Sequence, residues 1–234
     1  MISTKNIDTG SGSSIPKTLS PGVQVVKINS ITLSEVPYKK GAFNLLLNVE
    51  GPDMGEEFEG FYIDNDDHSL GRYDGPVGTV KTTKWYYADG ETRNGDPVNR
   101  DMEIMKFLKK LCIRAGEEAW FAAIDGKYNT IEEMVNGINK SKVFKNKWFK
   151  ICTAGREYPK KDSKFVGVDL FLPYDKGGKV SFELANTENS KLLTYNESEM
   201  LEKYEDTETV NGFGSDTEEV SSDSFMDDAP EFEL

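Results

Sequence analysis

Hydrophobic periodicity changes twice along this 234-residue chain, and the order of the changes restricts its fold. Segments rich in β-branched and aromatic residues come first, bounded by Gly, Pro and Asp turn signals. Such segments are typical of β-strands. We expect strands over residues 23–33, 43–51, 58–63 and 79–88.

Helical spacing then replaces the strand pattern over residues 99–116, where apolar residues recur three and four positions apart. Asn99 or Asp101 can cap the start of this helix, and Gly116 stands where a C-terminal glycine is favoured. Shorter helical segments are expected over residues 117–124 and 130–138. The second of these begins with Thr130 and Glu133 at the spacing of a capping box.

Strand patterns resume after the helices, over residues 148–154, 165–172 and 179–184. Locally joined strands with one helical block argue against a parallel α/β sheet. We therefore predict a mainly β fold, an OB-fold-like antiparallel barrel with a helical insertion between strands and disordered termini. A β-sandwich with an inserted helical segment is the alternative that fits the same pattern.

Charge is distributed very unevenly. Residues 197–234 contain fourteen acidic residues and one lysine, which accounts for the whole formal charge of −13. The rest of the chain is neutral, with 27 acidic and 27 basic residues. We divide the chain into a flexible arm (1–20), a folded domain (21–184), a linker with a short helix (185–212) and a disordered acidic tail (213–234).

Signals for catalysis are weak. The chain has a single histidine, His68, and lacks the GxSxG, P-loop and HExxH patterns. Two cysteines, Cys112 and Cys152, are too few for a zinc cluster and are expected to be buried free thiols. We expect no enzyme, metal or cofactor, the alternative being a nuclease that uses the region of Asp64 and Asp66.

Signals for nucleic-acid binding are stronger, because lysines and aromatic residues interleave over residues 140–164 and again over 81–87. Cations neutralise phosphates, and aromatic rings stack on bases. In the alternative interpretation, alternate aromatic residues form the core and the lysines are an ordinary solvated face. We predict a DNA-binding set of Lys81, Lys84, Trp85, Tyr87, Lys145, Lys147, Trp148, Lys150, Arg156, Tyr158, Lys160 and Lys161.

Trp148 is the strongest candidate for a stacking platform, since alternation puts it on the face of Lys150 and puts Phe149 and Ile151 on the core side.

The end of the chain, residues 225–234, places apolar residues and a proline among acids. This pattern indicates a short motif that docks to partner proteins, the alternative being a tail that only increases solubility. The docking residues would be Phe225, Asp227, Asp228, Pro230 and Phe232.

Four stretches together resemble the single-stranded DNA-binding proteins of bacteria and tailed phages. They are PKTLSPGVQVVKINSITL (16–33), NVEGPDMGEEFEGFYID (48–64), FKICTAGREY (149–158) and MDDAPEFEL (226–234). The resemblance implies an OB-fold that coats single-stranded DNA in replication, recombination and repair. It also implies a tail that recruits replication proteins and competes with DNA for the groove. Tips in this family usually end on or near Phe, whereas Glu233 and Leu234 follow Phe232 here.

The expected partners are thus single-stranded DNA and replication proteins, and the pattern allows for a homo-oligomer. No apolar run approaches the length of a membrane helix, and the start of the sequence has no apolar signal-peptide core. We expect a cytoplasmic protein, in the host cytoplasm if a phage encodes it. The alternative function is a phage structural or assembly protein with a β-rich body that docks to other proteins.

Overall fold

The computed structural model describes residues 18–52, 76–160 and 166–205. The expected strand at 58–63, the region of Asp64 and Asp66, Lys161 and all five docking residues of the tail lie outside the described residues.

Five strands form the body of the domain: β1 (Gly22–Glu35), β2 (Phe43–Glu50), β3 (Val77–Lys81), β6 (Trp148–Pro159) and β7 (Val166–Phe171). The sheet runs in the order β1-β2-β3-β7-β6, and β1 also pairs with β6, so the sheet partly closes on itself. This is the mainly β, OB-fold-like barrel that the sequence predicts. The sheet is mixed rather than antiparallel throughout, because β3 pairs in parallel with β7.

Four short strands accompany the five main ones in the described residues. β8 (Phe182–Leu184) and β9 (Leu201–Glu202) add to the edges of β6, while β4 (Gly90–Glu91) and β5 (Pro97–Val98) form a separate hairpin.

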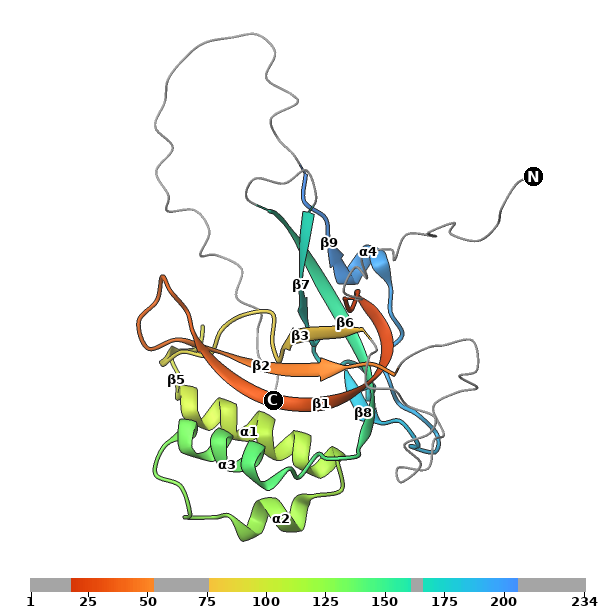
Figure 1. Ribbon diagram of the computed structural model, residues 1–234. Coiled ribbons are helices and arrows are strands. Elements are labelled where there is room, and N and C mark those ends of the chain that lie inside the picture. The colour runs from red at the N-terminus through yellow and green to blue at the C-terminus, as the bar shows by residue number, and fades with distance from the viewer. Residues whose placement is uncertain (1–17, 53–75, 161–165, 206–234) are drawn as a thin grey trace, which may run out of the picture.

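The helical insertion lies between β5 and β6 and consists of α1 (Arg100–Arg114), α2 (Glu118–Ala123) and α3 (Ile131–Ser141). Figure 1 shows the three helices together at one end of the barrel, while β6 and β7 extend away from them with β9 and α4 (Glu197–Met200) alongside. Asn99 caps α1 by accepting a hydrogen bond from the Met102 amide, as predicted. Thr130 caps α3 through the Glu133 amide, but the Glu133 carboxylate accepts from the Asn129 amide and not from Thr130.

The core lies between the inner face of the barrel and α1. Alternate residues of β2, among them Leu45 and Leu47, are buried, and so are Ile104, Leu108 and Leu111 on one side of α1. Phe149 and Ile151 belong to this core, as the alternation predicts. Cys112 and Cys152 are buried free thiols, and burial raises the pKa of Cys112 to about 12.

β1 bends so that it can pair with two neighbours, and α3 covers its exposed edge. Residues Gly22 to Lys27 pair with β6, residues Lys27 to Glu35 pair with β2, and the register shifts between Ile28 and Ser30. Beyond the bend, the side chain of Asn139 pairs with the Ile31 backbone, donating to its carbonyl at 2.8 Å and accepting from its amide at 2.9 Å. Asn139 therefore replaces the strand partner that β1 lacks at this point.

Several sequence-based boundaries differ from the structure. Leu19, within the flexible arm expected over residues 1–20, is buried in the core, and its amide donates to the Val77 carbonyl. The strand expected over residues 79–88 ends at Lys81; after an irregular stretch the chain returns to β2 only at Tyr87, which forms an isolated bridge with Phe43. The packed chain continues past residue 184: Ala185 and Leu193 are buried, and the expected short helix is α4 (Glu197–Met200). β9 follows α4 directly and pairs with β6, so the first residues of the acidic segment are part of the domain.

Candidate nucleic-acid interface

The structure places most of the predicted DNA-binding residues on two separate surfaces. Two further members of the set, Tyr87 and Lys147, contact the core and α1 instead. Lys81, Lys84, Trp85, Arg156 and Tyr158 gather on the outer face of β3, β7 and β6 and on the segment after β3. Lys145, Trp148 and Lys150 belong to a second surface, beside the first half of β6. Lys160 is exposed just beyond the end of β6.

A ladder of alternating charges crosses the first surface. The Lys81 ammonium lies 2.5 Å from Asp169 of β7, and strand pairing sets Asp169 opposite Arg156 of β6. Arg156 in turn donates from Nε to Glu202 of β9 at 2.6 Å, and Lys84 forms an ion pair with the same carboxylate. The ladder arises because side chains in register on adjacent strands point to the same face.

Trp85 and Tyr158 provide aromatic surface beside this ladder. The Trp85 ring lies 5.3 Å from the Lys84 ammonium and 5.4 Å from the Arg156 guanidinium, and 39 % of the residue is exposed. Tyr158, 41 % exposed, lies over Gly167 of β7, where a Cβ would stand 2.3 Å from Tyr158 Cζ. The missing side chain at Gly167 thus leaves room for the ring.

Residues outside the predicted DNA-binding set extend this surface. Tyr38, in the loop between β1 and β2, is 81 % exposed and meets Tyr86 edge-to-face at 6.1 Å. The Lys39 ammonium lies 5.0 Å from the Tyr86 ring. We call the combined surface the aromatic strip; it consists of Tyr38, Lys39, Lys84, Trp85, Tyr86, Arg156 and Tyr158.

The exposed aromatic residues concentrate at this strip. Five aromatic residues of the described chain are more than a third exposed: Tyr38, Trp85, Tyr158, Tyr174 and Tyr204. Three belong to the strip. Tyr174 lines a cleft with Trp85 and Tyr86, and the Tyr204 amide donates to Glu157, next to Arg156. Tyr38 and Tyr174 lie in loops, so no periodicity in the sequence could reveal on which surface they stand.

The second surface is a basic groove between the bend of β1 and the end of α3. It has a volume of about 340 Å³, and Lys27, Lys142 and Lys145 are among its lining residues, with no carboxylate side chain in the described lining. The Lys27 ammonium lies 4.5 Å from the ring of Trp148, which is half-buried. Lys150 follows on the same face of β6.

Two members of the predicted set have structural roles instead. The Tyr87 ring is partly buried and packs against the core, and its hydroxyl lies 3.0 Å from the Thr82 hydroxyl; desolvation raises the pKa of Tyr87 to about 12. Lys147 donates to the Ala115 carbonyl at 2.8 Å and pairs with Glu117 at 2.9 Å, so it caps the end of α1. The Tyr87 ring therefore lies outside the exposed face of the strip, where only its hydroxyl end lines a neighbouring cleft, and the Lys147 ammonium is held by the end of α1.

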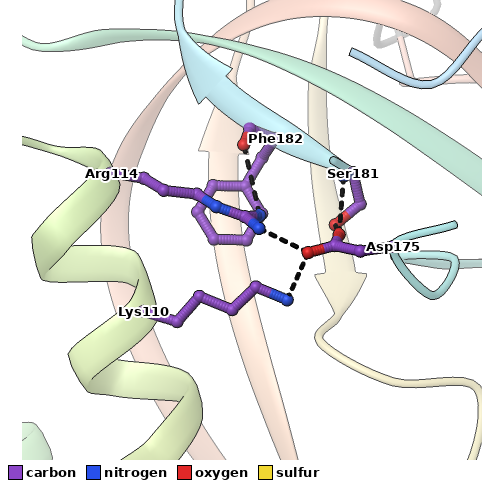
Figure 2. A network of polar contacts seen from close by, with 5 residues as sticks. All are labelled: Lys110, Arg114, Asp175, Ser181 and Phe182. Carbon is purple, nitrogen blue, oxygen red and sulfur yellow. Dashed lines mark hydrogen bonds and ion pairs between the residues drawn. The ribbon is translucent and has the colours of Figure 1, made fainter. Parts of the chain in front are cut away.

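A second ion network holds the loop after β7 against α1. Figure 2 shows Lys110 and Arg114 of α1 converging on the carboxylate of Asp175, with Ser181 on its other oxygen. Partial burial disfavours the charged carboxylate, but the hydrogen bonds from Arg114, Lys110 and Ser181 outweigh it and lower the pKa of Asp175 to about 2. Arg114 also lies 4.6 Å from the Phe182 ring, which connects the network to the core.

Comparison with known proteins finds no matching family model, no matching curated protein and no matching solved structure. Within the described residues, no group of three or more His, Cys, Asp or Glu side chains is arranged to hold a metal ion. No helix in the same residues is long and apolar enough to cross a membrane.

Proposed function

We propose that this protein binds single-stranded DNA without catalysis, through the aromatic strip, and coats it during replication and recombination. The observation that carries the proposal is the concentration of exposed aromatic residues among Lys39, Lys84 and Arg156, on a barrel of OB-fold type. The strip begins at the β1–β2 loop and ends where β6 leads toward β7, and OB-folds use these two loops to bind oligonucleotides.

The energetics suit binding that tolerates any base sequence. Each base stacked on an aromatic ring contributes about 1–3 kcal/mol, and every base presents a flat face. Lysine and arginine neutralise phosphates and release counterions, so such binding weakens steeply as the salt concentration rises.

The acidic segment is proposed to compete with DNA. Glu202 forms ion pairs with both Lys84 and Arg156. Residues 206–234, a few positions further along the chain, contain ten acidic and no basic residues. In this proposal the tail also recruits replication proteins through Phe225, Asp227, Asp228, Pro230 and Phe232.

The test is titration of a fluorescent oligo(dT) of about 16 nucleotides, the upper range for one OB-fold. The full chain is compared with a chain ending at Glu205, because β9 must be kept as part of the sheet. We expect binding that falls with salt and is tighter without residues 206–234.

Charge at the strip is tested by Lys84→Ala, which should weaken binding. Lys127→Ala removes an exposed lysine between α2 and α3 and is the matched control. If neither chain binds oligo(dT) at low salt, the proposal is wrong, and a body that docks to other proteins becomes the better interpretation.

A further inference from the structure

A cleft of about 390 Å³ opens beside the aromatic strip, in the size range of small-molecule sites. It lies between the segment after β3, one side of α1, and the loop that joins β7 to β8. Aromatic side chains form much of its lining, which includes Trp85, Tyr86, Phe107 and Tyr174. Trp85 and Tyr86 belong to both the cleft and the strip, so the two are continuous.

Hydroxyl groups provide polar positions within these aromatic walls. Thr82 Oγ1 and Tyr87 Oη lie 3.0 Å apart, and Thr83 Oγ1 lies 3.5 Å from Tyr174 Oη. A hydroxyl both donates and accepts hydrogen bonds. One hydrogen bond between Thr82 and Tyr87 uses only one of their two hydroxyl hydrogens, so the pair retains a donor and acceptor lone pairs.

The charged residues of the cleft are paired, which favours an uncharged ligand. Arg100, Lys106 and Lys110 line it, and each forms an ion pair, with Asp101, Glu103 and Asp175 respectively. Asp175 and Ser181 belong to the network of Figure 2, so the wall that carries Tyr174 is tied to α1. The cleft is therefore built before any ligand arrives.

Flat aromatic walls, hydroxyls that can donate or accept hydrogen bonds, and a lining whose charges are paired together match one class of ligand, an uncharged nucleobase. We propose that the cleft accepts a single nucleobase turned out of the bound strand, while the neighbouring phosphates stay on Lys84 and Arg156. This inference rests on the proposed binding of single-stranded DNA and adds a defined base site to it.

The experiment uses the full chain and an oligo(dT) of about 16 nucleotides in which one thymine is replaced by photoreactive 5-iodouracil. After irradiation, mass spectrometry identifies the cross-linked residues. An inserted base should cross-link to Tyr87 or Tyr174 of the cleft, whereas a base stacked only on the strip would reach Tyr38 or Tyr158.

Two variants test the same site by affinity. Ala88→Leu adds bulk to a half-buried residue of the cleft lining, and Tyr174→Ala removes a wall residue that is about half exposed and so can be lost without unfolding the domain. Each should weaken binding about tenfold, the effect of losing one stacked base. Tyr38→Ala is the control: it weakens binding and leaves the cross-links in the cleft unchanged.

The possible results separate the base site from the proposed function. Wild-type affinity in both variants, with cross-links confined to Tyr38 and Tyr158, would overturn the base site and leave DNA binding intact. Absence of binding by the wild-type chain would overturn both. If Ala88→Leu unfolds the domain, Tyr174→Ala and the cross-links decide the matter.

Discussion

Under the proposed function, replacing Glu202 should increase DNA binding. Its carboxylate holds both Lys84 and Arg156, the two cations beside Trp85. Glu202→Gln removes this negative charge and keeps the size and the backbone pairing of β9. We expect the variant to bind oligo(dT) more tightly, because two cations become available to phosphates.

The size of the effect follows from counterion release. Each phosphate contact with single-stranded DNA contributes a slope of about −0.7 to the logarithm of affinity against the logarithm of salt concentration. Two additional contacts would steepen this slope by up to about 1.4. When the salt concentration is lowered from 1 M to 0.1 M, the affinity of the variant should therefore rise up to about 25-fold more than that of wild type. The two ion pairs are partly exposed, so the loss of each should cost the fold no more than about 1 kcal/mol.

The assay is fluorescence anisotropy of labelled oligo(dT) over a salt series, with Glu188→Gln as control. Glu188 is exposed in the loop after β8, so its replacement makes the same charge change away from the strip. Equal affinity and equal salt slope for wild type and Glu202→Gln, or an equal gain in Glu188→Gln, would refute the reasoning.

The pH dependence gives a second check on Glu202. Partial burial disfavours its charged form, but hydrogen bonds from Lys84 and Arg156 outweigh this and lower the pKa of Glu202. The carboxylate therefore stays charged through the usual glutamate range and is protonated only as the pH falls below it. Wild type should reach the affinity of Glu202→Gln only in that acidic range.

Three further predictions concern stability and the shape of the strip. Asn139→Ala leaves the Ile31 backbone without its hydrogen-bond partner and should lower the free energy of unfolding, measured by urea titration, by about 1–3 kcal/mol. The control is Asn136→Ala, an exposed position on the same helix, which should leave the free energy of unfolding unchanged. Gly167→Ala places a Cβ against the Tyr158 ring and should displace the ring, at a cost of about 1–3 kcal/mol in the free energy of unfolding. The variant should also bind oligo(dT) more weakly in titrations. An unchanged affinity would exclude Tyr158 from the interface. Because the folded-state pKa of Asp175 is lowered to about 2, its network stabilises the fold above the ordinary Asp pKa and is lost as the pH falls toward 2. The melting temperature of Asp175→Asn should accordingly lie below that of wild type at pH 6, with the difference shrinking toward pH 2.

Sequence patterns were enough to predict the architecture. Strand alternation over β1, β2, β6 and β7, and the helical spacing of α1, specify which residues face the core, because these periods belong to single elements. Local capping signals such as Asn99 were also readable, since the capping side chain and the amide that it accepts from are three residues apart.

The candidate site was only partly readable, because it depends on contacts between distant segments. The interleaving of lysines and aromatic residues predicts that Tyr87 and Lys147 bind DNA, yet the Tyr87 ring packs against the core and the end of α1 engages Lys147. Tyr38 and Tyr86 meet through the packing of two loops; Tyr38 has no period around it, and the strand period expected around Tyr86 does not hold beyond Lys81.

The sequence by itself determined the composition of this protein: a neutral β-rich domain joined to an acidic segment, with cations and aromatic residues in its strands. The tertiary structure decided which of those residues stand together. Register across β3, β7, β6 and β9 set Lys81, Asp169, Arg156 and Glu202 side by side, although they come from four separate parts of the chain. Charge and aromaticity are properties of single residues, whereas a surface that can bind depends on which distant residues the fold brings to one face.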